Sequence, residues 1–369
     1  MSDNGCRGSV RLYSLDVLRG LDMLLLTVVG PIVQAAQKSW KCFPEAFMRQ
    51  FSHGWECFTL WDIIMPLFIF MCGAAVPFSL PKRLKDGRPG VEYWRHVLCR
   101  VAMLWVCGML IQGRLLSFDP LQIGYFTNTL QAIAVGYLFS AAAILIPKCA
   151  VRAALTVSLF LVYAAALHLW GDYTPAGNLT AVVERKILAA LLPAGSRWLD
   201  VGFYTWILPS VMFAAMTMCG VHAAEILRSA LGERKKALAL FGYALLLLSA
   251  GWAAAVRVPV IKPIYTVSFT LQAMGWSVAS LAGLYVLTDV WRLRRGLALP
   301  VLFGQCALTA YMATNEPFRP ALRQLSETLT AGMAARFAPR AAPFMAACAA
   351  AAVVALILMA RRRIGSGRR

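Results

Sequence analysis

The chain has 369 residues, of which 60% are hydrophobic and only 14% are charged. A soluble domain carries about a quarter charged residues, so this composition excludes that class and indicates a membrane protein. The net charge of +19 would suggest a nucleic-acid partner in a soluble protein. Lys and Arg also gather in the cytoplasmic loops of membrane proteins, so we expect no nucleic acid. The ten cysteines form no C-x-x-C pair and no metal-ligand spacing, so we expect no metal and no disulfide framework.

Long apolar runs recur along the chain and predict an all-α, polytopic membrane protein, because helices of roughly 20 apolar residues satisfy their backbone in lipid. We predict about ten transmembrane helices, at residues 15–36, 58–80, 94–113, 126–146, 153–170, 205–227, 237–256, 266–287, 298–315 and 342–360. Lys and Arg are more frequent in the N-terminus and in every second connection than in the other connections. The positive-inside rule therefore predicts that both termini are cytoplasmic.

We expect a single domain over residues 1–369, with two features outside the predicted helices. The largest outer loop is predicted at residues 171–204, and it holds an amphipathic segment at 179–192 that we expect to form a surface helix. Arginines dominate residues 361–369, which predict a basic cytoplasmic tail.

Charged residues also lie inside two of the predicted spans. Arg19 and Asp22 are three residues apart on one face of the first span, so they can form a buried ion pair. The alternative is an anion site for a phosphate-bearing ligand on the cytoplasmic side. Arg100 lies within the third span, where a charge is expected to face the bundle interior or a water-filled cavity. Its partner is expected to be Asp16, Asp22 or a ligand anion.

The stretch that leads into the second span is polar at its start and apolar at its end. This pattern predicts the outer end of a transmembrane helix, hereafter the mouth of that helix. His53, Trp55 and Glu56 lie at this mouth, where ionisable groups are costly and usually functional. An imidazole at a water–lipid boundary can act as a general base, although a lone histidine is more often structural. Asp62 also has two interpretations. It completes a capping box with Thr59, and a capping carboxylate can still belong to the site.

Two polar residues near later helix ends are further candidates. Gln131 is expected to form an interhelical hydrogen bond or to bind a ligand. Lys262 precedes the eighth span on the outer side, where it can bind an anion or extend its ammonium toward water. The chain has no G-x-x-x-x-G-K-S/T motif, no G-x-S-x-G motif and no metal-binding histidine pair. These absences argue against an ATP motor, a serine hydrolase and a zinc enzyme.

Several motifs resemble one known family, and they occur in the family's order. Arg11–Gly20 is similar to R-x-x-S-x-D-x-x-R-G, and His53–Gly73 is similar to H…W-x-x-x-T-x-x-D-x-x-x-P-x-F-x-F-x-x-G. Leu130–Gln131, Pro259–Ser268 and Phe303–Leu308 resemble later segments of the same family. This family is the transmembrane acyltransferases that include heparan-alpha-glucosaminide N-acetyltransferase and its bacterial relatives. The resemblance covers nearly the whole chain.

The resemblance implies a transferase of the bacterial inner membrane. It would move an acetyl group from cytoplasmic acetyl-CoA to an amino sugar, or to a sugar hydroxyl, on the outer side. The family's histidine corresponds to His53, which would act as a base or carry the acetyl group. The expected site residues are His53 and Asp62 for catalysis, Arg19, Arg100 and Gln131 for the cofactor, and Trp55, Glu56 and Lys262 for the acceptor.

Two features depart from the family pattern and leave alternatives open. Gly30 stands where the family has an asparagine, and only Gly54 separates the histidine from the tryptophan. A family member that has lost its catalytic activity is therefore one alternative. The other is a transporter for a saccharide or cell-wall fragment, which Arg100 and the Gly30–Pro31 helix break favour. Membrane lipid and the saccharide are the expected partners, and a homodimer is left open.

Overall fold

The computed structural model describes residues 12–85, 87–175, 177–200 and 203–366. Within these residues the regular structure is helical. The β-type pairs among them are two isolated bridges, Glu56 with Ile261 and Lys85 with Arg88. The predicted all-α class is therefore confirmed.

The α-helices are α1 (Tyr13–Leu24), α2 (Gly30–Trp40), α3 (Glu45–Arg49), α4 (Leu60–Ser79), α5 (Val91–Ile111), α6 (Thr129–Ala143), α7 (Cys149–Trp170), α8 (Leu179–Leu191), α9 (Ser210–Arg228), α10 (Glu233–Ala255), α11 (Val267–Tyr285), α12 (Ala298–Gln305), α13 (Ala307–Ala313), α14 (Arg319–Phe337) and α15 (Ala342–Ser366). Two π-helical segments, η1 (Leu25–Val29) and η5 (Val286–Val290), continue α1 and α11. Four short 3-10 turns are η2 (Pro81–Arg83), η3 (Leu115–Ser117), η4 (Arg197–Leu199) and η6 (Pro339–Ala341).

Seven helical segments in the described part of the chain are long and apolar enough to cross a membrane. They are α4, α5, α7, α9, α10, α11 with η5, and Pro339–Arg363, which includes most of α15. Their length and composition indicate an integral, multi-pass membrane protein. The other three predicted spans form shorter helical pieces. These are α1 with η1 and α2, the 15-residue α6, and the pair α12 and α13, which meet at Cys306.

Helix α4 lies in the centre of the bundle, and most of its side chains are buried. It crosses α9 at two glycines, one from each helix. A Cβ atom on Gly73 would lie 1.9 Å from the carbonyl oxygen of Thr217, and one on Gly220 would lie 2.0 Å from that of Phe70. Only glycine permits this backbone approach, and small residues commonly allow such close helix packing in membranes.

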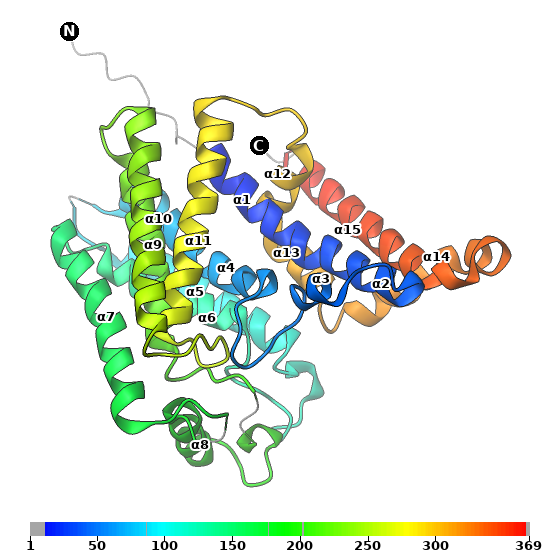
Figure 1. The fold of residues 1–369 in the computed structure, drawn as a ribbon, viewed down its shortest axis with the longest axis horizontal. Coiled ribbons are helices and arrows are strands. Elements are labelled where there is room, and N and C mark those ends of the chain that lie inside the picture. Colours follow the sequence, from blue (N-terminus) through cyan, green and yellow to red (C-terminus); the bar gives the residue numbers. More distant parts are fainter. Residues whose placement is uncertain (1–11, 86, 176, 201–202, 367–369) are drawn as a thin grey trace.

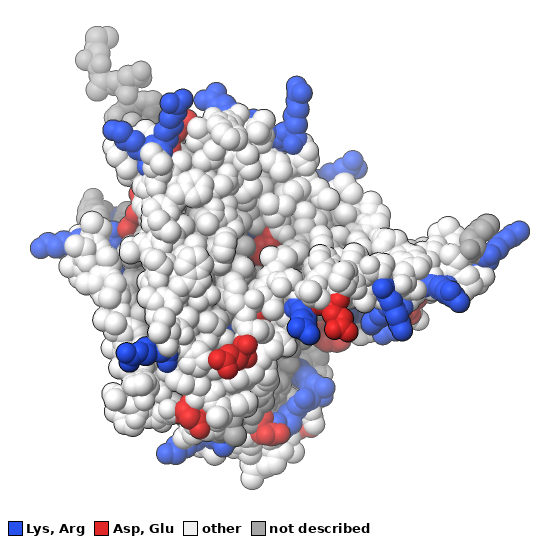
Figure 2. All heavy atoms as spheres, in the orientation of Figure 1, with Lys and Arg blue, Asp and Glu red and all other residues white. Residues whose placement is uncertain are grey.

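Different helices lie at the two ends of the molecule, and both ends carry basic side chains (Figure 1, Figure 2). The start of α1 and the end of α15 lie at one end, whereas α8 and the connection before α4 lie toward the other (Figure 1). Figure 2 shows Lys and Arg side chains around both ends, with a largely uncharged surface between them. Both described ends of the chain therefore lie at one end of the molecule (Figure 1), and the cytoplasmic location of both termini stays a prediction.

Three helices lie outside the predicted spans: the five-residue α3 and the longer α8 and α14. Helix α8 forms where the amphipathic segment predicted a surface helix. Helix α14 occupies a stretch in which we predicted only a connection. Its Ser326, Thr330 and Ala334 are buried at a spacing of four residues, and α14 packs on α15. Because its buried face is made of small and polar residues, α14 produces no apolar run that would reveal it in the sequence.

Candidate active site

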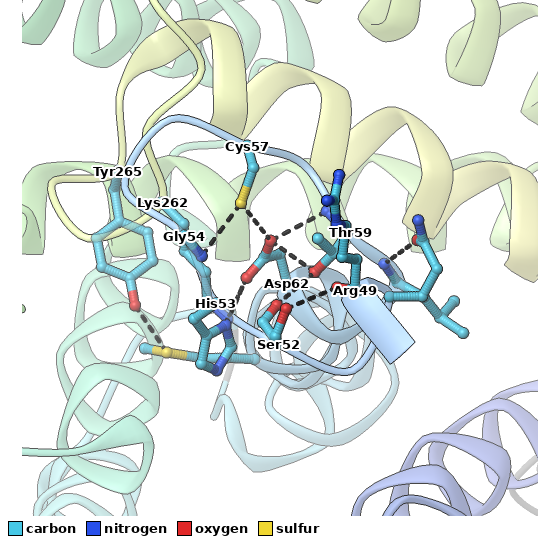
Figure 3. A network of polar contacts seen from close by, with 12 residues as sticks. Arg49, Ser52, His53, Gly54, Cys57, Thr59, Asp62, Lys262 and Tyr265 are labelled. Carbon is cyan, nitrogen blue, oxygen red and sulfur yellow. Dashed lines mark hydrogen bonds and ion pairs between the residues drawn. The ribbon is translucent and has the colours of Figure 1, made fainter. Parts of the chain in front are cut away.

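The connection before α4 folds around the carboxylate of Asp62. Asp62 Oδ2 accepts hydrogen bonds from the backbone N–H of Thr59 at 3.0 Å and from its hydroxyl at 2.8 Å, which completes the predicted capping box. The other carboxylate oxygen, Oδ1, lies 2.7 Å from Nδ1 of His53 (Figure 3). Asp62 therefore caps α4 and orients His53 at the same time.

Lys262 reaches the same carboxylate from the connection between α10 and α11. Its Nζ lies 3.2 Å from Asp62 Oδ1 and 3.4 Å from His53 Nδ1. Only 6% of the Lys262 side chain and 1% of that of Asp62 are exposed. Burial lowers the pKa of the Lys262 ammonium, and the charge of Asp62 opposes this lowering. The two buried charges thus compensate each other.

This arrangement determines which nitrogen of His53 is available for chemistry. A carboxylate only accepts hydrogen bonds, so the short contact to Asp62 requires a proton on Nδ1. In the neutral imidazole the lone pair is then on Nε2. The exposed fraction of the His53 side chain is 34%, so a ligand can reach it. A histidine held by a buried carboxylate is the arrangement that general bases and nucleophile activators use.

His53 faces a cavity of about 650 Å³, hereafter the first cavity. Lys262 and Glu184 line this cavity, as do the amide side chains of Gln112 and Asn315. Aromatic side chains form much of the remaining wall: Trp61, Phe68, Tyr125, Phe126, Trp198, Tyr204, Trp206 and Tyr311. Aromatic faces together with a few polar groups suit a small polar ligand with an apolar ring face, such as a sugar.

Glu184 lines the first cavity, although the sequence predicted only that it belongs to an amphipathic segment. It is 4% exposed, and its Oε2 accepts hydrogen bonds from the backbone N–H groups of Trp206 at 2.6 Å and Ile207 at 3.1 Å. Burial raises the pKa of Glu184 to about 7. Thr180, Ala181 and Glu184 are buried at helical spacing. This spacing is the sequence feature that could have predicted that Glu184 lies on the buried face of α8.

Trp55 and Glu56, expected to bind the acceptor, lie beside the first cavity and do not line it. Trp55 Nε1 donates to the backbone oxygen of Tyr173 at 2.9 Å, and its ring packs edge-on against Phe203 at 5.5 Å. Trp55 therefore connects the mouth of α4 to the loop 171–204. Glu56 is exposed and pairs through its backbone with Ile261, so it supports the connection that carries Lys262.

A second cavity of about 510 Å³ contains two of the three residues expected to bind the cofactor. Arg19 and Arg100 both line it, together with His96. Arg100 also lies 4.5 Å above the ring of Tyr137. Gln131 does not line it, because its side chain accepts from Thr127 N at 2.7 Å and donates to the Tyr125 oxygen at 2.6 Å. Gln131 thus holds the connection before α6 in place.

The two cavities share part of their walls. Phe68, Thr129 and Tyr311 line both of them. The two cavities are therefore adjacent at these three side chains. Within the described ranges, no group of three or more His, Cys, Asp or Glu side chains is placed to hold a metal ion.

No protein-family model matches the chain, and no curated protein matches it. We therefore infer the function from the geometry of the two cavities.

Proposed function

We propose that the protein is a membrane acyltransferase that moves an acetyl group from acetyl-CoA in the second cavity to a sugar amine or hydroxyl in the first. The observation that carries the proposal is the oriented His53–Asp62 pair in a cavity that shares its wall with a second, basic cavity. In this proposal ten helices cross a bacterial inner membrane. The second cavity opens to the cytoplasm, and His53 faces the outer side.

The second cavity has the chemistry that an anionic donor requires. Arg19 and Arg100 supply guanidinium groups, which bind phosphate in a planar, two-point fashion. The apolar side chains of Met23, Leu104 and Leu308 lie in the same wall and suit an uncharged arm between phosphate and thioester. The thioester would then approach the wall made by Phe68 and Tyr311.

The proposed reaction needs a base and little further activation, because a thioester is already reactive. His53 Nε2 takes a proton from the acceptor ammonium or hydroxyl. The acceptor nitrogen or oxygen then attacks the acetyl carbonyl carbon, its bond to carbon forms, and the carbon–sulfur bond breaks. For an amine, a second N–H proton is lost and one proton ends on the CoA thiolate. In the alternative course, His53 Nε2 itself receives the acetyl group and passes it on.

The replacement of the family's asparagine by Gly30 has a visible cause. A Cβ on Gly30 would lie 2.3 Å from Cη2 of Trp61, so the ring of Trp61 occupies the space of a side chain there. The first cavity contains other amides, Asn315 and Gln112. The Asn315 amide donates one hydrogen bond to the Tyr311 oxygen at 2.7 Å and retains a second N–H. We assign Asn315 the role of stabilising negative charge on the acetyl carbonyl oxygen.

The test is acetyl transfer by the purified protein from labelled acetyl-CoA to a panel of amino sugars and sugars. His53→Ala is expected to abolish transfer, because it removes the base. His168→Ala is the matched control, since His168 is an exposed histidine of α7 that lines neither cavity. Absence of transfer by the wild type, or equal transfer by His53→Ala, would contradict the proposal.

The second candidate function is saccharide transport, which the shared wall between two cavities also favours. Sugar uptake by proteoliposomes that contain no CoA distinguishes the two functions. Uptake of a sugar under these conditions, together with no stabilisation of the protein by CoA, would favour the transporter. The acyltransferase predicts no uptake and a higher melting temperature with CoA, because CoA would bind the native state.

A further inference from the structure

The second cavity reaches the outer surface of the bundle along α5. The α5 residues that line it are His96, Cys99, Arg100, Met103 and Leu104, and their spacing of three and four residues places them on one stripe of the helix. Cys99 is exposed and Met103 is 49% exposed, whereas Leu104 is buried. One edge of the cavity therefore lies at the surface of α5, and the other lies inside the bundle.

Helices α12 and α13 form the opposite edge. Gln305, the last residue of α12, lines the cavity and is exposed, and Leu308 of α13 lines it just beyond the break at Cys306. We call the gap that Cys99 and Met103 share with Gln305 the side opening. Helix α5 is long and apolar enough to cross a membrane, and both of these α5 residues lie in its middle third. The side opening therefore lies at the depth of the lipid chains.

The wall of the second cavity changes from basic to apolar along α5. His96 comes first, Arg100 follows one turn later, and Arg19 of α1 supplies a second guanidinium to the same cavity. Met103 and Leu104 lie one turn beyond Arg100, toward the centre of the helix. This order suits an amphiphile whose anionic head lies toward the start of α5 and whose hydrocarbon chain lies toward its middle.

Arg100 is held in a position from which it can bind such a head. Its guanidinium carbon lies 4.5 Å above the ring of Tyr137, which fixes the side chain against the wall. A guanidinium has five N–H donors, so it can bind a phosphate while it keeps this contact. A charge inside a membrane span is costly and is usually paired, and a phosphate would supply the opposite charge.

We propose that the second cavity binds an anionic phospholipid, whose phosphate contacts Arg19 and Arg100 and whose acyl chain passes through the side opening. Basic pockets between transmembrane helices bind anionic headgroups on the cytoplasmic side, and in the predicted orientation α5 begins on that side. This lipid site does not depend on acetyl transfer.

The lipid site has a consequence that rests on the proposed function. Phe68, Thr129 and Tyr311 line both cavities, so an acyl chain in the second cavity covers the wall that the thioester would approach. The lipid and acetyl-CoA also need the same two guanidinium groups. The anionic lipid content of the membrane would therefore regulate binding of the donor.

The first experiment counts the lipids that stay bound to the protein. Nanodiscs with equal amounts of phosphatidylglycerol and phosphatidylcholine offer an anionic and a zwitterionic lipid together, and native mass spectrometry of the released protein counts each. The wild type is expected to retain phosphatidylglycerol about tenfold over phosphatidylcholine, the ratio that one charge-assisted hydrogen bond gives. Equal retention of the two lipids would overturn the inference.

Two pairs of variants on α5 locate the site. Arg100→Gln is expected to lose the preference, whereas Arg95→Gln should keep it, because Arg95 is exposed and lines neither cavity. Met103→Trp fills the side opening and should lower retention of phosphatidylglycerol. Val106→Trp should not, since Val106 is exposed on the same helix and lines neither cavity. An unchanged preference in Arg100→Gln or unchanged retention in Met103→Trp would exclude the proposed site.

Melting temperatures show that the variants are folded and identify the source of the phosphate. Phosphatidylglycerol should raise the melting temperature of the wild type and of Arg95→Gln, because a ligand of the native state stabilises it. It should leave that of Arg100→Gln unchanged. Glycerophosphoglycerol carries the same phosphate without acyl chains, and we expect no stabilisation by it at the same concentration. Equal stabilisation by both compounds would mean that the cavity binds a free phosphate ester and not a lipid.

The retention assay contains no acetyl-CoA, so it tests the lipid site even if no acceptor is ever acetylated. If the wild type transfers acetyl groups, phosphatidylglycerol should raise KM for acetyl-CoA and leave KM for the acceptor unchanged. An unchanged KM for acetyl-CoA would show that the lipid and the donor do not share the second cavity.

Discussion

The carboxylate of Asp62 shows how several functions meet in one side chain. Its two oxygens contact Thr59, His53 and Lys262. Burying a carboxylate costs several kcal/mol unless it is paired and hydrogen-bonded, and here both oxygens have partners. The helix cap and the orientation of the histidine therefore depend on each other. A change that disturbs the start of α4 also moves the proposed base.

Glu184 leads to a prediction for stability against pH. Its pKa is raised by burial from 4.5 to about 7 in the folded protein, so the folded state binds the proton more tightly than the unfolded state. The contribution of this group to stability is therefore greatest below about pH 4.5 and is lost as the pH rises to about 7, by up to about 3 kcal/mol. Glu184→Gln has no such dependence.

The measurement compares melting temperatures of the wild type and Glu184→Gln across this pH range. The wild type is expected to lose stability relative to the variant as the pH rises from about 4.5 to about 7. A constant difference, or one that changes in the opposite direction, would show that Glu184 does not hold its proton as inferred.

Local sequence could predict half of the polar site. His53 and Asp62 are nine residues apart, and a capping box next to a histidine indicated both. Lys262 was also expected at the site, but its contacts with His53 and Asp62 could not be predicted, because 209 residues separate it from His53. Glu184 was predicted only as part of a surface helix, and the packing of distant elements brings it to the same cavity. Periodicity describes which face of one helix is buried, and it does not say which other helix that face meets.

At the scale of elements, the apolar runs predicted the long helices well and the short ones poorly. Helices α4, α9 and α10 coincide with predicted spans, because each is a single uninterrupted apolar segment. The pair α12 and α13 and the π-helical η1 divide other apolar runs into pieces. Hydropathy reports that a segment is apolar, but the point at which its backbone hydrogen bonding changes depends on its neighbours.

The crossing of α4 and α9 gives a prediction at this scale. Gly73→Ala places a Cβ 1.9 Å from a backbone oxygen of α9, so the helices must separate. We expect a loss of about 1–3 kcal/mol of stability, the usual cost of overpacking, and a loss of transfer activity, because α4 carries Asp62. Thermal unfolding in detergent and the transfer assay measure the two effects.

Gly242→Ala is the matched control, because Gly242 lies within α10 and nothing is within 4 Å of its added Cβ. This variant should be neutral or slightly more stable, since alanine favours the helix by about 0.5–1 kcal/mol. Equal stability of the two variants would show that the close approach of α4 and α9 is not required.

At the scale of the whole molecule, the important feature is that two cavities meet inside one bundle. Tyr311 lines both, and it comes from α13, one of the short helices. Tyr311→Ala removes a large part of the shared wall and should let water from the first cavity reach the thioester. We expect faster release of CoA from acetyl-CoA without any acceptor, together with less transfer per CoA released.

The rate of thiol formation without acceptor measures this loss of coupling. Tyr125→Ala is the control, because Tyr125 lines only the first of the two cavities. Equal thiol formation by the two variants would mean that Tyr311 does not separate the donor from water.

Helix α4 runs from one cavity to the other. Asp62 orients His53 near its start, Phe68 lies in the shared wall, and Cys72 lines the second cavity. Ten residues of α-helix separate Asp62 from Cys72, which corresponds to about 15 Å along the axis. Since both residues belong to one continuous helix, this length is constant. In the proposed reaction it sets how far the donor must extend its reactive end, so we expect a shorter thioester to bind in the second cavity without reaching His53.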